Sequence, residues 1–443
     1  MFKRIGSTAV LTILLTISLF ADSRARIVRL SDVEGTVQVD RNTGQGFEKA
    51  FLNMPISQGM RLQTQDDGRA EVEFEDGSTF RLTPDSQVDF DQLSLRDSGA
   101  KVSSVEIENG TAYLNFRGKS DDEFTLDFGD ETLTATRPAH LRVRVSDQQA
   151  TLAVLKGEVS VSGPSGSVDL SRRKSATFDL SNDDQYTVAD NYESDPYDSW
   201  DKQQQQYQDR YMSSNSYTDT TYNYGMSDLN YYGNYVDVPG YGFLWQPYFT
   251  GYGWDPYANG AWVFYPGYGY NWVSAYPWGW APYHSGSWVF LPGQGWFWQP
   301  GGAWTGWNVV PRFVNPPARY NPPKPPPKAG GTVVVNHGPT PPVAPPVRKM
   351  TIRNDSAGLG VPRGSVLNLG KVSQQVNENG SAIVKMHTSP VVASAPAAMP
   401  HTTAVRPTAP TVARPAPAPH IAPAGHVASP HVSSPHVSAS PHK

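Results

Sequence analysis

The chain of 443 residues is long enough for two or three domains, and its 39 glycines, 39 prolines and 17% charged residues favour turns, β structure and disorder over long helices. The absence of cysteine excludes disulfides, thiolate metal sites, cysteine nucleophiles and lipidation at a cysteine. The net charge of −5 hides an asymmetry, because residues 26–225 contain 20 basic and 35 acidic side chains, whereas residues 311–443 contain 13 basic and two acidic ones. Such a basic tail contacts a polyanion, contacts the acidic body, or stays solvated.

The first 25 residues have the pattern of a secretory signal. Lys3 and Arg4 precede an apolar run at residues 9–20, which is shorter than the roughly 20 residues that a membrane span needs. Small residues favour cleavage after Ala25, with cleavage after Ala21 or an uncleaved anchor as alternatives. No later segment is apolar enough to span a bilayer. We therefore expect an extracytoplasmic protein, in the periplasm, associated with the outer envelope or secreted, without a transmembrane span after signal removal.

Residues 26–180 alternate apolar and polar side chains over short runs, which is the period of half-buried strands. Turn-forming dipeptides such as Asn109-Gly110 separate the runs, because they tolerate the positive φ angles of tight hairpins. Strands at this spacing without a helical period predict an all-β sandwich, barrel or solenoid. The predicted strands include residues 36–39, 70–74, 112–116, 124–128, 141–145, 152–155 and 159–161.

This region contains four successive motifs: VEG at 33–35, GRAEVEFEDGS at 68–78, ENGTAY at 108–113 and VLKGEVSV at 154–161. Together they resemble the FecR-type domain, and we assign residues 26–180 to a FecR-like β domain. The resemblance implies an all-β extracytoplasmic domain. In the best-known members this domain lies in the periplasm, senses an occupied outer-membrane receptor and controls an extracytoplasmic sigma factor.

The N-terminus departs from the pattern of those regulators. They hold the sigma factor with a cytoplasmic segment that precedes a membrane helix, whereas here only residues 1–8 precede the apolar run. We therefore expect that this chain does not itself hold a sigma factor. The domain is expected to act as a binding module or an envelope scaffold, with sensing beside a separate anti-sigma protein as an alternative.

Residues 181–226 read as a polar linker. Within it, residues 195–212 predict one helix, because Pro196 suits a first helical turn and Trp200, Tyr207 and Tyr211 are spaced to share a face. The simplest interpretation is a solvated linker helix that docks through Trp200.

Residues 227–310 form an aromatic block with an internal repeat. Residues 231–307 hold 11 of the 12 tryptophans and 28 aromatic residues, with no Lys or Arg and with Asp237 and Asp255 as the only acids. The sequence WDPYANGAWVFYPGYGYNW at 254–272 recurs 26 positions later as WAPYHSGSWVFLPGQGWFW at 280–298. A fixed period indicates units that stack on their neighbours.

Each repeat predicts a hairpin of two short strands joined by a Pro-Gly turn of type II. The predicted pairs are 261–265 with 270–274 and 287–291 with 295–298. Alternation places Trp262 and Phe264 on one face and Val263 and Tyr265 on the other. We expect a small β meander or barrel that is filled by tryptophans and has tyrosines at its rim.

The block also resembles an uncharacterised family of Trp/Tyr-rich repeats that is often found behind FecR-type domains in bacterial envelope proteins. The motifs that support this are DLNYYGN at 228–234, GYGFLWQPY at 240–248, WGWAPYHSGSW at 278–288 and GWFWQP at 295–300. This resemblance implies no activity.

The aromatic rings have two interpretations. Most of them can form the core that a charge-poor domain of this size needs. Alternatively, exposed rings can stack on a ligand such as a sugar, and the candidates for such stacking are Trp254, Tyr257, Trp278, Trp280 and Tyr283. Stacking on nucleic acid would need interleaved Lys or Arg, and the block has none.

Residues 311–443 predict a disordered basic tail rich in Pro, Ala and His, with extended polyproline stretches. Residues 361–386 are less biased in composition and predict a short ordered or docking patch. Repeated Ser-Pro-His motifs near the end offer only weak metal binding, so we predict no defined metal site.

No catalytic constellation is evident. His140 and His284 are the only histidines before the tail, and neither lies in a recognisable motif. Nucleophile elbows, phosphate-binding loops and the HExxH metal motif are all absent, so we expect neither enzyme activity nor a cofactor. The sequence predicts a non-enzymatic binding or scaffolding protein of the cell envelope, whose partner is an envelope protein. Binding of a glycan or peptidoglycan through exposed rings and sensing beside an anti-sigma system are the alternatives.

Overall fold

The structure is a computed structural model that describes residues 26–119, 121–182, 185–212, 225–301, 312–328, 330–336 and 349–386. The predicted signal segment and the end of the predicted tail lie outside the described residues. None of the helices in the described ranges has both the length and the apolar character that crossing a membrane requires.

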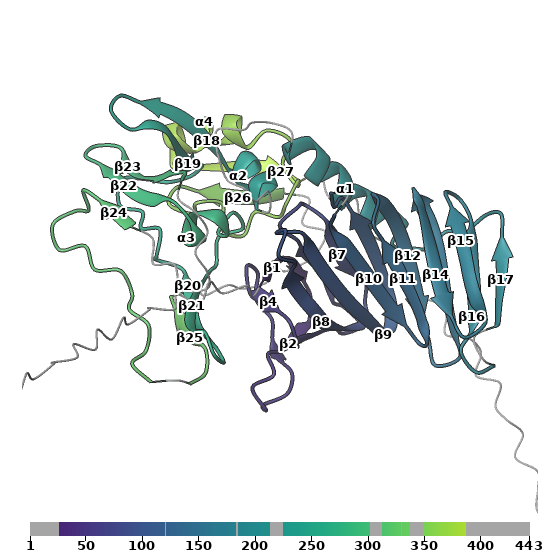
Figure 1. Cartoon of the computed structure of the whole chain (residues 1–443). Coiled ribbons are helices and arrows are strands. Elements are labelled where there is room, and N and C mark those ends of the chain that lie inside the picture. Colours follow the sequence, from purple (N-terminus) through teal and green to yellow (C-terminus); the bar gives the residue numbers. More distant parts are fainter. Residues whose placement is uncertain are drawn as a thin grey trace, which may run out of the picture. The chain divides into compact units, whose positions relative to one another are not determined.

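The first domain is a β sandwich, as one of the all-β alternatives predicted (Figure 1). Its two layers face one core, where Phe74 of one layer packs edge-on against Phe124 of the other with ring centroids 5.2 Å apart. In order, layer A consists of β4 (Pro55–Ser57), β1 (Ile27–Glu34), β6 (Arg69–Glu73), β7 (Thr79–Leu82), the second half of β9 (Lys101–Phe116), β12 (Ala139–Val145), β13 (Gln149–Lys156), β16 (Ser175–Asp179) and β17 (Gln185–Ala189).

Layer B has the same number of strands as layer A and shares β9 with it. In order it consists of β3 (Glu48–Lys49), β2 (Val37–Asp40), β5 (Arg61–Thr64), β8 (Gln87–Leu95), the first half of β9, β10 (Glu123–Phe128), β11 (Glu131–Ala135), β14 (Glu158–Gly163) and β15 (Gly166–Ser171). Neighbouring strands are antiparallel except for β9 and β10.

The strand β9 passes from layer B into layer A at Gly110. The prediction of a hairpin turn at Asn109-Gly110 is wrong, because the chain continues as one strand and only bends there. Gly110 has φ 94°, and a Cβ at this position would lie 2.3 Å from the hydroxyl oxygen of Ser86. Glycine meets both conditions without strain.

The helix α1 (Asp198–Met212) confirms the predicted linker helix, and Trp200 is buried as expected, but the helix also docks through polar side chains. It covers the outer face of layer A, where alternation places charged side chains. Its Asp198 accepts hydrogen bonds from Tyr113 at 2.9 Å and from Arg142 at 2.6 Å, and its Asp201 accepts one from Arg81 at 2.7 Å. Outward charges of this sheet therefore hold the linker instead of facing water.

The aromatic domain begins with α2 (Met226–Tyr232) and contains both predicted hairpins. β20 (Gly260–Tyr265) pairs with β21 (Gly269–Ser274), and β22 (Ser287–Leu291) pairs with β23 (Gly295–Gln299). In each turn the glycine after proline has a positive φ, 79° at Gly267 and 80° at Gly293, which fits the predicted type II geometry.

The two hairpins lie in different sheets, so the domain is not a single meander. One sheet has the order β18 (Gly233–Val238), β19 (Gly242–Pro247), β23, β22 and β24 (Arg312–Val314); the other has β21, β20 and β25 (Val333–Val335). A short helix, α3 (Ala281–His284), precedes β22.

Tryptophans fill the core of the aromatic domain, as predicted. Trp278 is fully buried and lies at its centre, with its ring centroid 4.9 Å from that of Trp245 and 5.0 Å from that of Tyr276. The prediction of tyrosines at the rim is wrong for much of the set. Tyr232 and Tyr283 are buried, and their hydroxyls donate to backbone carbonyls, which satisfies the polar end inside the core.

The opposite face of the first hairpin packs onto the sandwich. Val263 and Tyr265 of β20 belong to the same buried cluster as the sandwich core, and the guanidinium of Arg41 lies over the Tyr265 ring at 5.5 Å. The two faces that alternation predicted for this hairpin therefore serve two different cores.

The predicted disordered tail needs a correction, because β24 and β25 pair with strands of the aromatic domain and residues 349–386 form a folded segment. This segment contains β26 (Lys349–Arg353), α4 (Leu369–Asn379) and β27 (Ser381–Lys385), and its apolar side chains join the aromatic core. Trp278 donates from Nε1 to the carbonyl of Ala357 at 2.7 Å. Within this segment lie residues 361–386, for which an ordered patch was predicted.

We predict that Trp278→Ala lowers the free energy of unfolding by about 3–5 kcal/mol, because it leaves a cavity that the surrounding rings cannot fill. The midpoint of urea unfolding measures this loss. Tyr252→Ala is the matched control, since the Tyr252 side chain is 62% exposed and its removal should change stability by no more than about 0.5 kcal/mol. Equal effects of the two substitutions would contradict a core built around Trp278.

Candidate functional site: a buried polar joint

The five rings proposed for ligand stacking lie inside the protein. Trp254, Tyr257, Trp278, Trp280 and Tyr283 are each at most 5% exposed. Trp280 packs into the cluster of the sandwich core, and the other four join the aromatic core. A ring buried to this extent has no face to offer a ligand, so the arrangement favours the core interpretation.

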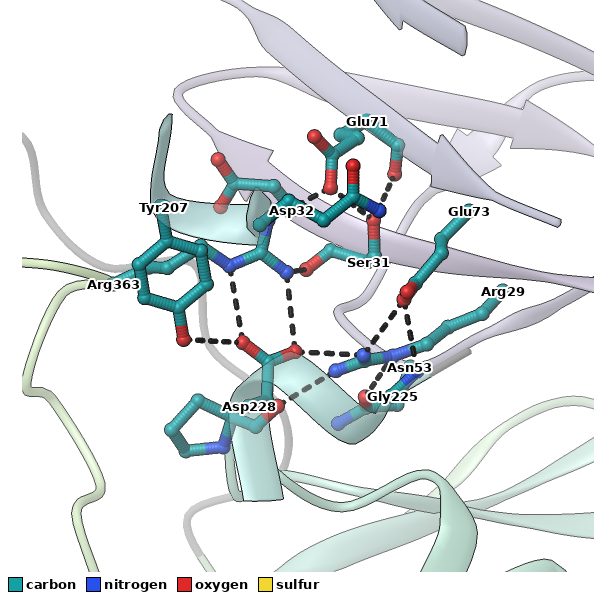
Figure 2. A network of polar contacts seen from close by, with 12 residues as sticks. Arg29, Ser31, Asp32, Asn53, Glu71, Glu73, Tyr207, Gly225, Asp228 and Arg363 are labelled. Atoms are coloured by element: carbon teal, nitrogen blue, oxygen red, sulfur yellow. Dashed lines mark hydrogen bonds and ion pairs between the residues drawn. The ribbon is translucent and has the colours of Figure 1, made fainter. Parts of the chain in front are cut away.

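The most concentrated polar chemistry lies instead between the sandwich and the aromatic domain (Figure 2). Its centre is the carboxylate of Asp228 on α2, which is 0% exposed. Arg29 lies 2.6 Å from Oδ2, and Arg363 donates to both carboxylate oxygens at 3.1 Å. The hydroxyl of Tyr207 donates to Oδ1 at 2.8 Å. One buried carboxylate thus joins β1, α1, α2 and the segment 349–386.

The sandwich contributes residues from two neighbouring strands of layer A. Arg29 and Ser31 alternate along β1, and Glu71 and Glu73 alternate along β6, so all four project from the outer face. Glu73 lies 3.2 Å from Arg29 and accepts the backbone N–H of Gly225 at 3.0 Å. The same alternation that builds the core therefore builds the joint.

Arg363 connects the C-terminal segment to both domains. Besides Asp228, its guanidinium donates to Glu71 at 2.7 Å and to the carbonyl of Ser31 at 2.6 Å, and it lies over the Tyr207 ring at 5.1 Å. The guanidinium of arginine is planar and has five N–H donors, so it can donate to two carboxylate oxygens while it stacks on an aromatic ring. Lysine cannot do both.

Backbone contacts extend the joint at its edge. The side-chain amide of Asn53 donates to the carbonyls of Ser274 and Tyr276, at 3.1 and 2.8 Å, and accepts from Arg29 at 3.0 Å. Arg29 also donates to the carbonyl of Pro277 at 2.7 Å. Because both groups are fully buried, these bonds replace the water that the backbone carbonyls lose.

The joint contains more acidic than basic side chains, and burial and neighbouring charges shift the pKa values of its acids. Burial alone raises the pKa of Glu71, but Arg363 and Arg81 overcome that effect and lower the pKa to about 2. Burial, with Asp228 and Glu71 nearby, raises the pKa of Glu73 to about 7 despite Arg29. Burial and the nearby Glu34 raise the pKa of Asp32 to about 7 as well. The joint therefore holds protons at mildly acidic pH.

The joint contains paired acids and bases but, among the described residues, no candidate metal site. Across the described ranges, the structure contains no group of three or more residues that could hold a metal ion. His140 of β12 lies 3.0 Å from Asp201 of α1. Burial lowers the pKa of His284 to about 4, and its Nδ1 lies 2.9 Å from the carbonyl of Trp280. What the arrangement does is lock four segments together.

Sequence reasoning missed this joint, although it had two signals. Asp228 stands in the motif DLNYYGN, in a block with almost no acids, and Arg363 stands in the less biased run at 361–386. An acid in a charge-poor core needs a cation, yet nothing in the sequence pairs positions so far apart.

We predict that stability falls as pH rises from about 5 to 8 and that Glu73→Gln reduces this fall. The native state binds the proton of Glu73 up to about pH 7, whereas the unfolded chain loses it near 4.5. Unfolding thus becomes easier across this window. At pH 8 the variant, which mimics the protonated form, should be about 1–3 kcal/mol more stable than the natural chain. Urea unfolding at several pH values measures this.

Exposed Glu193→Gln is the control, because it removes one carboxylate without touching the joint. A natural chain whose stability is flat between pH 5 and 8 would contradict the assigned protonation. A Glu73→Gln variant that is less stable than the natural chain at every pH would also contradict it.

Comparisons with known proteins match the two domains separately. Residues 60–160 match the family described as FecR protein, and residues 226–323 match a family of unknown function, DUF6600. A search of curated proteins found no match. The first match covers the middle of the sandwich, and the second covers the chain from α2 to β24. The segment 349–386 lies outside both matches.

Two solved structures from Parabacteroides distasonis, each described as a "putative anti-sigma factor", are similar to part of the chain. They are 17% and 16% identical in sequence, with 32% and 30% of this chain covered. The chain spans 63% and 59% of their lengths, and the TM-scores are 0.28 and 0.27. These scores carry no argument about function. The family matches identify this chain as one that contains a FecR domain followed by a DUF6600 domain.

Proposed function

We propose that this chain is a non-enzymatic extracytoplasmic protein that binds or scaffolds another protein of the bacterial envelope. The proposal rests on the edge strand β17 of layer A, which has no charged residue or proline to prevent pairing with another strand. Among the described residues, β17 pairs on one side only, with β16. Its sequence, QYTVA, has no charge and no proline, and its Val188 side chain is 46% exposed.

The other terminal strands of the sandwich are protected in familiar ways. β3 consists of Glu48 and Lys49, β4 begins with Pro55, and β15 contains Asp169. Charges and proline at an edge prevent another strand from pairing there. An edge that lacks them is a template for strand addition by a partner polypeptide. The contrast between β17 and the other three edges points to a protein partner at β17.

The FecR match supports a role in signalling. In the well-known members of that family the domain responds to another envelope protein, so sensing beside a separate anti-sigma protein is the second candidate. Binding of a glycan or peptidoglycan has less support, because the five rings that would stack on sugars are buried. Location outside the cytoplasm rests on the signal pattern at residues 1–25.

The proposal is tested by site-specific crosslinking in the living source cell. A photoreactive residue at the exposed Thr187 should give one discrete protein adduct, and Val188→Lys in the same chain should lower its yield about tenfold by charging the edge. Val236→Lys on β18 is the matched control, since Val236 is 38% exposed on a different domain. It should leave the yield unchanged.

The identity of the adduct separates the candidates. An anti-sigma protein or an outer-membrane receptor supports sensing, and a structural envelope protein supports scaffolding. A crosslink to polysaccharide, or no adduct sensitive to Val188→Lys, would overturn the proposed protein-binding role.

A further inference from the structure

The small sheet formed by β26 and β27 presents an uncompensated basic face. Successive side chains of a strand alternate between its two faces, and here one face packs while the other is exposed. Met350, Ile352, Ala382 and Val384 join the aromatic core. The exposed face consists of Lys349, Thr351 and Arg353 on β26 and Ser381, Ile383 and Lys385 on β27.

Three cations lie on this face: Lys349, Arg353 and Lys385. No ion pair to Lys349, Arg353 or Lys385 occurs within the part of the chain that the structure describes. The acid nearest to Lys349 and Arg353 in sequence, Asp355, accepts a hydrogen bond from the backbone N–H of Gly251 at 2.6 Å instead. The protein therefore leaves a local excess of positive charge at the surface.

The register makes this face unfavourable without a partner. Lys349 lies directly opposite Lys385, and like charges in directly opposed positions of antiparallel strands are destabilising. Between them and Arg353 lies Ile383, whose side chain is 74% exposed. The repulsion between the two opposed lysines and the exposure of the isoleucine both destabilise this face. A bound anion with apolar groups would reduce both effects.

The edges of this sheet point to the kind of anion. Within the described residues, β26 and β27 pair only with each other, so each has one edge of free backbone donors and acceptors. An extended polypeptide can pair with such an edge and place alternate side chains over the basic face. A membrane surface would use the charges but not the edges, and the face offers it only one large apolar side chain.

We propose that the sheet β26–β27 binds an extended acidic segment of a partner protein, which adds as a third strand with its carboxylates near Lys349, Arg353 and Lys385. This surface lies outside both family matches and on a different segment from β17. The inference therefore goes beyond the proposed function and does not depend on it.

The test uses residues 26–443 and a fluorescent eight-residue peptide of alternating Glu and Thr, with binding followed by fluorescence anisotropy. We expect saturable binding that weakens with salt. The double substitution Lys349→Glu and Lys385→Glu should weaken binding at least about tenfold, through loss of two charge contacts and gain of two repulsions. Lys324→Glu with Lys328→Glu is the matched control, because both lysines are exposed and the net charge change is identical.

Two further probes test the mode of binding. The same peptide with alternate backbone nitrogens methylated keeps its charges but cannot pair with an edge, and it should bind about tenfold more weakly. Unchanged urea midpoints show that the variants fold. Absence of peptide binding, equal binding of the methylated peptide, an equal effect of the control pair, or binding to phosphatidylglycerol vesicles without binding to the peptide would each overturn the proposal.

Discussion

The contact between Asp228 and two arginines is the constraint on which the rest of the structure depends. A buried carboxylate is costly unless it is paired and hydrogen-bonded, and Asp228 meets that need with Arg29, Arg363 and Tyr207. These partners come from three separate segments of the chain. Because removing one partner leaves the other charges buried and unpaired, the joint makes the sandwich, the linker helix and the C-terminal segment depend on each other.

The outer face of layer A explains how an ordinary strand pattern produces this dependence. Alternation along β1 and β6 assigns Arg29, Glu71 and Glu73 to the outside of the sandwich, where such residues usually meet water. Here α1, α2 and the segment 349–386 cover them. The charges that would solubilise an isolated sandwich instead specify what packs against it, and the aromatic domain needs few charges of its own.

Local features of this fold were predictable from sequence, whereas the joint was not. The 26-residue repeat predicts both aromatic hairpins, because strand alternation and Pro-Gly turns are local properties, and Gly267 and Gly293 have the positive φ that they require. For the aromatic rings, the sequence left two alternatives open, which were burial in the core and exposure to a ligand. Position 29 lies far from positions 228 and 363 in sequence, and no local pattern pairs them. Proline content predicted a disordered tail with a short ordered or docking patch at residues 361–386, but tertiary packing on the aromatic core orders all of residues 349–386.

Among the described residues, the edge strand β17 and the basic face of β26 and β27 are the two surfaces for which we propose a protein partner. Both are backbone-based surfaces on a rigid support, which suits a protein that holds or senses another polypeptide.

The most direct test of this account is hydrogen exchange of the natural chain and of Asp228→Asn, read segment by segment. The account predicts that the variant loses protection together in α1, α2 and residues 349–386, while the sandwich strands of layer B keep theirs. The exposed Asp237→Asn should leave every segment as it is in the natural chain. Unchanged protection of residues 349–386 in Asp228→Asn would contradict the claim that this one buried carboxylate holds the segments together.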